Sequence, residues 1–426
     1  MRRVKSAATV TMLCLCGLIA LAPAAYAQGV TVEQLVALAL QQAPELQVAR
    51  TEIGVASGQV TQAALRPNPL FTWAHEHEPG GMMITGADVE WPLDLFRRPA
   101  RVAVAQRMAD VTSMSIRDRE RLLASAVREQ AGRVLAARRN LELTNEALTA
   151  ARRTRDLLDR RVTEGGSTKL DSNLAAVEAM RLEADAALAA GELEGATIEL
   201  RALVGLAPDA PLALSESLES LAAAPAVPRL TATAAIETRP DLREAIARIQ
   251  LADARAEEAQ RDARSEVSLL GGWTRSHWTF PQLGLDHQGN HVPIQNTFHT
   301  YIVGAKVTLP FSNRNQGALA SAQAERNGAE LLFAARQRAA RAEIDAAVAR
   351  EREARRAVEI YSTNVRELAR QNVDVMLEAY DLGRFPLSDV LTEQRRYLEV
   401  EGAYTEVLLR AYEARAAVAR AFGEMP

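Results

Sequence analysis

The sequence predicts a mostly α-helical protein with a small β part, in which long coiled-coil helices and a β-hairpin occur twice. Three observations support this fold class. Only 4% of the 426 residues are aromatic, whereas 48% are hydrophobic and 24% are charged, a composition typical of Ala-, Leu-, Glu- and Arg-rich helices. Long stretches contain few Gly or Pro residues, and two shorter stretches show the period-two alternation of β-strands.

The chain begins with the features of a secretory signal peptide over residues 1–27. Basic residues within 2–5 precede a short apolar run at 10–21, and a small-x-small cleavage site ends at Ala27. The apolar run is too short to anchor the chain in a bilayer. We therefore expect cleavage after Ala27 and export of the mature chain.

Cleavage would remove both cysteines of the chain, Cys14 and Cys16, and would change the formal net charge from −4 to −7. The mature chain would then have no disulfide, no reactive thiol and no cysteine metal site. The alternative is a lipoprotein start, but Leu13 and Leu15 precede the two cysteines where a small residue is usual.

No later segment has about 18 consecutive apolar residues, so no transmembrane helix is expected. If the exported chain spans a membrane, it must do so with β-strands. The acidic balance gives no argument for a nucleic-acid partner.

Internal duplication is the strongest signal. Pro92 and Pro310 each open a long helical stretch and lie 218 residues apart. The turn sequences at 165–171 and 383–389 have the same separation, Gly to Gly and Asp to Asp. We therefore expect two structural repeats, 28–205 and 231–426, joined by a Pro-containing linker.

Each repeat is expected to run helix, β-hairpin, very long helix and return helix, with Gly turns between the long and the return helices. The linker between them is residues 206–230, which contain four prolines. The predicted helices are 32–65, 99–164 and 170–204 in the first repeat, and 232–264, 315–382 and 387–422 in the second.

The helix predicted at 99–164 would be on the order of 100 Å long, which favours coiled coils over a compact core. Its apolar seam repeats every seven residues. The seam residues are Val127, Val134, Leu141 and Leu148, and the second repeat has 3–4 spacing over Ile344, Ala347, Ala354, Val358, Tyr361, Val365, Leu368 and Val375. A solvated two-helix rod is one interpretation; abundant Ala around the whole circumference favours a sheet of helices.

The β-hairpins are predicted at 70–91, with a turn at Gly80-Gly81, and at 266–309. Each strand would have about ten residues, enough to cross a bilayer when tilted. All four Trp residues lie in these segments, as in an interfacial aromatic belt. Four strands cannot close a barrel, and unpaired strand edges are not tolerated in lipid. Several chains must therefore contribute strands to one shared barrel. Three chains would supply twelve strands; two or four are not excluded by this arithmetic.

These features resemble the TolC family of outer-membrane efflux factors over essentially the whole mature chain. The most specific stretches are 307–317 and the turn 383–389. The resemblance implies a homotrimer with an α-barrel in the periplasm and a shared 12-stranded transmembrane β-barrel in the outer membrane. It implies a periplasmic adaptor and an inner-membrane RND-type pump as partners, and neither catalysis nor a cofactor. In its details the chain is similar to the heavy-metal branch (CzcC- and CusC-like).

The resemblance also implies a periplasmic aperture near the helix turns, with an acidic ring that attracts cations. The residues at the corresponding positions are Asp389, Tyr380, Asp171 and Arg384. The chain departs from the family pattern at two positions. Thr392 stands where the family has a second aspartate, and Phe385 stands where the family has an arginine. The alternative is that both aspartates cap the return helices, as Asp near a helix start often does.

All six histidines lie in the β segments: His75, His77, His277, His287, His291 and His299. Alternate residues of a strand share a face, so His75 and His77 could chelate a metal with Met82 and Met83 nearby. The alternative is an ordinary polar rim.

We therefore expect an outer-membrane channel, a passive exit duct for metal ions or small toxic compounds. The alternative function is that of a periplasmic adaptor-type coiled-coil protein, although an adaptor would have one hairpin beside a β-rich half. An enzyme is not expected, because the chain has no nucleophile elbow, P-loop or dinucleotide-binding glycine pattern.

Overall fold

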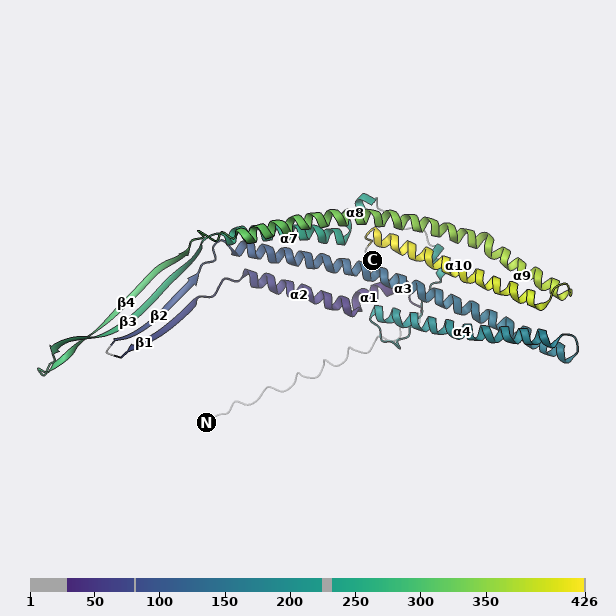
Figure 1. Ribbon diagram of the computed structural model, residues 1–426, viewed down its shortest axis with the longest axis horizontal. Helices are drawn as coiled ribbons and strands as arrows, with labels where there is room; N and C mark the ends of the chain where they lie inside the picture. Colours follow the sequence, from purple (N-terminus) through teal and green to yellow (C-terminus); the bar gives the residue numbers. More distant parts are fainter. Residues whose placement is uncertain (1–28, 80–81, 224–231, 425–426) are drawn as a thin grey trace, which may run out of the picture. The chain divides into compact units, whose positions relative to one another are not determined.

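The computed structural model describes residues 29–79, 82–223 and 232–424, and is shown in Figure 1. The expected signal peptide, the first hairpin turn and the end of the predicted linker lie outside these ranges. The described residues fall into two compact units. Of these residues, unit 1 comprises 29–44, 120–223 and 344–424, and unit 2 comprises 45–79, 82–119 and 232–343.

Unit 2 contains one antiparallel sheet of four strands, which lie side by side in Figure 1. The strands are β1 (Leu70–Glu78), β2 (Met82–Pro92), β3 (Glu266–Leu285) and β4 (His291–Thr308), in the order β1-β2-β3-β4. Strands β1 and β4 each pair with one neighbour, so within the described part of the single chain both edges of the sheet are open.

The second hairpin is longer than the sequence suggested. Strands β3 and β4 have 20 and 18 residues rather than about ten. β3 pairs with β2 only as far as Trp278; beyond it, β3 and β4 continue as a two-stranded ribbon with a register shift between Thr279 and Leu283. The expectation was wrong because the residues after Trp278 and before Asn296 pair with each other and so lengthen both strands.

The two faces of the sheet differ in chemistry. One face carries a cross-strand row of Trp73, Ala87, Trp273 and Tyr301, in which Tyr301 is 75% exposed. The opposite face carries polar side chains, including an ion pair of 3.2 Å between Glu90 and Lys306. An exposed apolar face opposite a charged one is the pattern of a strand between lipid and water.

Two helices predicted as continuous are each broken at a proline. The prediction 32–65 becomes α1 (Val32–Gln42) and α2 (Pro44–Ala64), and 232–264 becomes α6 (Ala232–Thr238) and α7 (Pro240–Asp262). The ring of a proline disfavours helical dihedral angles in the residue before it, and Ala43 accordingly has ψ 122°.

Helix α3 (Arg98–Thr163) begins in unit 2, where Val111 packs against Ala247 and Leu251 of α7. Helix α8 (Gln316–Ile360) is held to α7 by ion pairs such as Arg336–Glu244 at 3.0 Å. The helices of this unit therefore pack through apolar side chains and are also joined by ion pairs.

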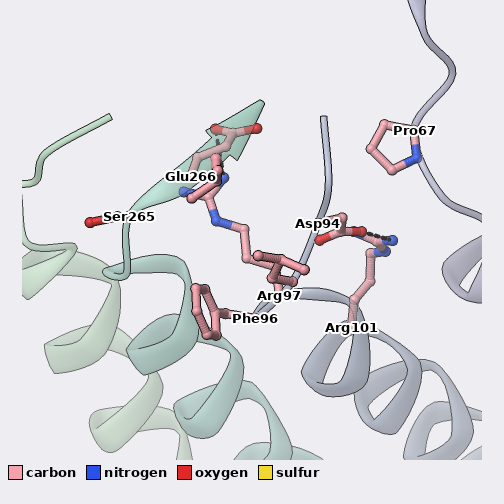
Figure 2. A pocket seen from close by; sticks show the side chains of 9 residues that line it. Pro67, Asp94, Phe96, Arg97, Arg101, Ser265 and Glu266 are labelled. Carbon is pink, nitrogen blue, oxygen red and sulfur yellow. Dashed lines mark hydrogen bonds and ion pairs between the residues drawn. The ribbon is translucent and has the colours of Figure 1, made fainter. Parts of the chain in front are cut away.

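The junction between strand β2 and helix α3 is fixed by charged side chains (Figure 2). Asp94 has a positive φ of 46°, and its carboxylate accepts a hydrogen bond from Arg101 at 2.8 Å. Arg97 pairs with Glu266 at the start of β3 at 3.2 Å. These residues line a small cavity of about 110 Å³, so we interpret it as part of the joint and not as a ligand site.

Unit 1 consists of packed helices. It holds the later part of α3, α4 (Lys169–Val204), α5 (Leu218–Ala223), α9 (Arg366–Asp381) and α10 (Leu387–Ala421). Its core includes the fully buried side chains of Leu35, Val127, Leu135, Leu200, Leu218 and Leu408. Helix α5 lies within the segment predicted to be a linker. Among the described residues, no helix is both long and apolar enough to cross a lipid bilayer.

The predicted seams are covered to different extents. Val127, Val134 and Leu148 of the first seam are buried, as expected. In the second seam Leu368 and Val375 are 59% and 63% exposed, so the described part of this single chain does not cover them.

The long helix predicted at 315–382 is interrupted by one π-helical segment, Tyr361–Val365, between α8 and α9. The Thr363 hydroxyl donates a hydrogen bond to the Glu359 carbonyl at 2.5 Å beside it. A π-helical turn widens the backbone and marks a place where a helix departs from ideal periodicity.

Candidate functional site: the paired helix turns

The two helix turns of unit 1 are built alike. Gly165 and Gly383 follow α3 and α9 with φ of 76° and 71°, a left-handed conformation that glycine adopts without steric cost. The backbone N–H groups of Gly166 and Arg384 each donate to a carbonyl five residues earlier, at 2.7 and 2.9 Å. Both helices thus end in the same glycine C-cap.

Asp171 caps the return helix α4. The Asp171 backbone N–H donates to Thr168 Oγ1 at 3.2 Å, and the Asp171 carboxylate accepts from the Thr168 backbone N–H at 3.3 Å. The Thr168 hydroxyl also donates to the same carboxylate at 2.6 Å. This reciprocal pattern is a capping box, so the carboxylate of Asp171 is used within its own helix.

Asp389 occupies the equivalent place in α10 but does not cap it. The N-cap residue is Pro386, which has no N–H to offer a carboxylate and no capping side chain. The Asp389 side chain is exposed and accepts a hydrogen bond of 3.2 Å from the Ser388 hydroxyl. The capping alternative therefore fits Asp171 and not Asp389.

The two turns pack against each other within unit 1. Leu158 of α3 and Ala175 of α4 form a buried cluster with Leu387 and Leu391 of α10, and Tyr380 of α9 packs against it. Burial and the nearby negative charge of Asp171 raise the pKa of the Tyr380 hydroxyl. Tyr380 and Asp171, both expected at the aperture, are therefore brought together, whereas Arg384 is exposed beside them.

An ion-pair cluster near the turns was not predicted from the sequence. The buried carboxylate of Glu178 on α4 accepts hydrogen bonds from Arg395 of α10 at 2.6 Å and from Arg181 at 2.6 Å. Burial opposes ionisation of Glu178, but the two guanidinium groups outweigh it and hold its pKa below the usual value. The available signal was that Glu178 lies within the buried stripe of α4, between Ala175 and Leu182.

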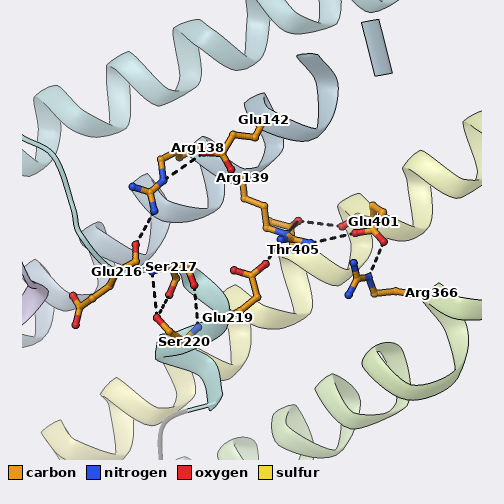
Figure 3. A network of polar contacts seen from close by, with 10 residues as sticks. All are labelled: Arg138, Arg139, Glu142, Glu216, Ser217, Glu219, Ser220, Arg366, Glu401 and Thr405. Atoms are coloured by element: carbon orange, nitrogen blue, oxygen red, sulfur yellow. Dashed lines mark hydrogen bonds and ion pairs between the residues drawn. The ribbon is translucent and has the colours of Figure 1, made fainter. Parts of the chain in front are cut away.

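A second polar cluster lies farther along unit 1 and is shown in Figure 3. Glu401 of α10 is 1% exposed and accepts hydrogen bonds from Arg366 of α9 at 2.7 Å and Arg139 of α3 at 3.2 Å. The guanidinium groups of both arginines lie over the Tyr404 ring, 4.4 and 5.4 Å from its centroid. A buried carboxylate shared by two cations joins three helices.

Helix α5 is attached to the same cluster. Arg139 also pairs with Glu219 of α5, and Arg138 donates to the backbone carbonyls of Leu214 and Glu216 at 2.9 and 2.7 Å. The segment between the repeats is therefore anchored by arginines of α3.

No group of three or more His, Cys, Asp or Glu side chains in the described part of the chain is arranged to hold a metal ion. His75 and His77 do share one face of β1, as expected. The Nδ1 atom of His75 lies 2.9 Å from the Thr85 hydroxyl, and its ring stacks on Trp73 with centroids 6.2 Å apart.

Comparison with known proteins identifies the family of this chain. The family described as outer membrane efflux protein matches residues 35–206 and 221–424. The chain belongs to this family. It is an efflux channel protein of the outer membrane, in a family of channels and not of enzymes, and this decides against the adaptor-type alternative. The resemblance seen in the sequence is confirmed.

Individual relatives agree with this assignment. The chain is 25% identical to the cobalt-zinc-cadmium resistance protein CzcC of Cupriavidus metallidurans, over 92% of this chain and 90% of CzcC. Its fold is similar to crystal structures of CusC, with 18% identity, 92% coverage of both chains and a TM-score of 0.75. It is also similar to the outer membrane protein VceC of Vibrio cholerae, with 20% identity, 92% and 96% coverage and a TM-score of 0.71.

Proposed function

We propose that the mature chain is the exit duct of a tripartite efflux system, a homotrimer that works with a periplasmic adaptor and an inner-membrane RND-type pump. The sheet of unit 2 lies in the outer membrane and the helices lie in the periplasm. The duct is passive, because energy and direction come from the pump.

The observation that carries this proposal is the open sheet of unit 2. It has an exposed apolar face, a charged face and two edges that pair with no other described residue of the chain. Unpaired backbone groups are not tolerated in lipid, so the edges must pair with other copies. Three copies supply twelve strands and close a barrel whose charged face, with Glu90 and Lys306, lines water.

Exposed apolar residues on the helices of unit 1 fit the same assembly. Val177, Met180 and Leu188 follow one side of α4 and are 62–70% exposed. Leu368 and Val375 of α9 continue a coiled-coil seam that remains exposed among the residues that the structure describes. Neighbouring copies would cover both stripes.

The cargo is proposed to be metal ions, with small toxic compounds as the second class. The 25% identical relative CzcC is a cobalt-zinc-cadmium resistance protein, and the resemblance of the sequence is to the heavy-metal branch. The pump selects the cargo in such a system, so the duct needs only a wide, polar lumen.

The paired turns are proposed to form the periplasmic aperture. Asp389 would supply one carboxylate per copy to a cation-attracting ring, because its side chain is exposed and does not cap α10. Tyr380, Asp171 and Arg384 would hold the closed arrangement, since Tyr380 already joins the two turns.

Two measurements test this function. A strain lacking the gene should become more sensitive to Co²⁺, Zn²⁺ or Cd²⁺, and the wild-type gene should restore its tolerance. The purified protein should form ion-conducting channels in planar lipid bilayers. Unchanged tolerance to metals and to organic toxicants, together with no conductance, would refute the proposal.

A further inference from the structure

Three strands of unit 2 place a histidine, a methionine and a histidine in one row. His77 of β1 is directly opposite Met83 of β2, and Met83 is directly opposite His277 of β3. Directly opposite residues of antiparallel strands lie about 5 Å apart at Cα and project to the same face. The thioether therefore stands between two imidazoles whose backbones are about 10 Å apart.

The three side chains of the row offer imidazole nitrogen and thioether sulfur as ligand atoms. Glu76 and Glu78 alternate with His77 along β1, so their carboxylates project from the other face. The row lies one residue from the end of β1 and one residue from the start of β2, at the tip of this hairpin and not in the middle of the lipid-facing sheet. There His77 is exposed, Met83 is 41% exposed and His277 is half-buried, so ions from solvent reach the row. Thioether and imidazole without carboxylate favour a soft cation over a hard one.

His277 is positioned as a metal ligand. Its Nδ1 lies 3.0 Å from the hydroxyl of Thr297, the residue opposite it on β4. With Nδ1–H donating to that oxygen, the Nε2 lone pair is free to bind a metal. His75, two residues before His77, has the same relation to Thr85 at 2.9 Å.

We propose that His77, Met83 and His277 bind one soft monovalent cation, Cu(I) or Ag(I), through two imidazole nitrogens and one thioether sulfur. Zn²⁺ would require about four ligands, and the described residues contain no cluster of three His, Cys, Asp or Glu side chains that could hold a metal. The row is therefore suited to low coordination numbers.

The bound cation cross-links β1, β2 and β3. The row lies on the face that carries Trp73 and Trp273, opposite the face of Glu90 and Lys306. The site is thus separate from the proposed water-filled path, and it goes beyond the efflux of cargo. Its effect is to stabilise the sheet when the soft ion is present.

The test uses the full mature protein in detergent, purified without a polyhistidine tag. Titration with Ag(I) in chloride-free buffer should give one site per chain and raise the apparent melting temperature. Met83→Leu, which conserves side-chain volume, should weaken Ag(I) binding about tenfold or more. His77→Gln and His277→Gln should do the same, and Cu(I) X-ray absorption should lose its sulfur scatterer in the Met83→Leu protein.

Matched controls are Met82→Leu, on the other face of the same strand, and His291→Gln, at the far end of β4; both should bind Ag(I) as the wild type does. Wild-type affinity in Met83→Leu, equal losses in the controls, or Zn²⁺ binding as tight as Ag(I) would each overturn the proposal. Efflux tolerance in vivo is scored separately, so failure of the metal site leaves the duct proposal intact.

Discussion

Arg395 of α10 donates two hydrogen bonds to one carboxylate oxygen of Glu178 on α4, from Nε at 3.0 Å and from Nη2 at 2.6 Å. These two helices begin at the two turns proposed to form the aperture, so this pair holds one helical hairpin to the other. Because Glu178 is buried, the stability of this ion pair depends on the Glu178 carboxylate being ionised.

The stabilisation by Glu178 should depend on pH. Its pKa in the folded chain is below the usual value of 4.5, so the contribution is complete above about pH 4.5 and is lost as the pH falls below it. Glu178→Gln should lower the apparent melting temperature at pH 7, and the difference from wild type should shrink between pH 4.5 and pH 3. An equal difference at both pH values would contradict the assignment.

The two equivalent aspartates should behave differently when replaced. Asp171→Ala removes a capping box and should cost about 1 kcal/mol of stability, whereas Asp389→Ala should change stability little. In planar bilayers Asp389→Ala should reduce cation selectivity, because the proposed ring loses an exposed carboxylate that takes no part in capping α10. Equal melting temperatures for the two variants, or unchanged selectivity in Asp389→Ala, would refute the division of roles.

The buried carboxylate of Glu401 should be among the most sensitive positions of unit 1. Glu401→Ala leaves Arg139 and Arg366 without their shared partner and should cost about 3 kcal/mol or more. The control is Glu406→Ala on the same helix, whose pair with Arg410 is exposed and should contribute less than about 1 kcal/mol. Thermal unfolding followed by circular dichroism measures both; similar losses would contradict the burial argument.

Helices α3 and α10 approach closely at Gly132. A Cβ atom there would lie 2.6 Å from the ring of Tyr412, which is buried in the core of unit 1. Gly132→Ala should therefore destabilise the protein by about 1–3 kcal/mol, although alanine is the better helix former.

The control for this close approach is Gly191→Ala in α4, where, apart from the adjoining residues and backbone of α4 itself, no described atom lies within 4 Å of the added Cβ. This variant should keep or raise the melting temperature, because alanine reduces the entropy of the unfolded chain. If both variants shift the melting temperature equally, the packing at Gly132 is not as described.

The order of elements could be predicted because each has a local signal. The long runs with few Gly or Pro gave α3 and α4 to within one residue, and Gly165 and Gly383 marked the turns. The helix breaks before Pro44 and Pro240 could also have been predicted, because proline disfavours helical dihedral angles in the residue before it. The helical periodicity on both sides of each proline hid this signal.

Other features depend on tertiary contacts and had no local signal. The length of β3 and β4 comes from their pairing with each other beyond Trp278, and the π-helical segment at Tyr361–Val365 lies beside the Tyr404 stack. At the site, the duplication predicts the same role for Asp171 and Asp389. Their roles differ because the N-cap residue is Thr168 in one helix and Pro386 in the other, which only the structure shows. Arg395, which pairs with Glu178, and the two arginines that pair with Glu401 lie on other helices, and sequence spacing does not reveal such pairs.

The central claim is that the four-stranded sheet is completed by other copies of the chain in the outer membrane. Native mass spectrometry of the mature protein, extracted from outer-membrane fractions in mild detergent, tests this most directly. We expect a complex of three chains that dissociates only on heating. A single chain recovered from the soluble periplasmic fraction would contradict the account.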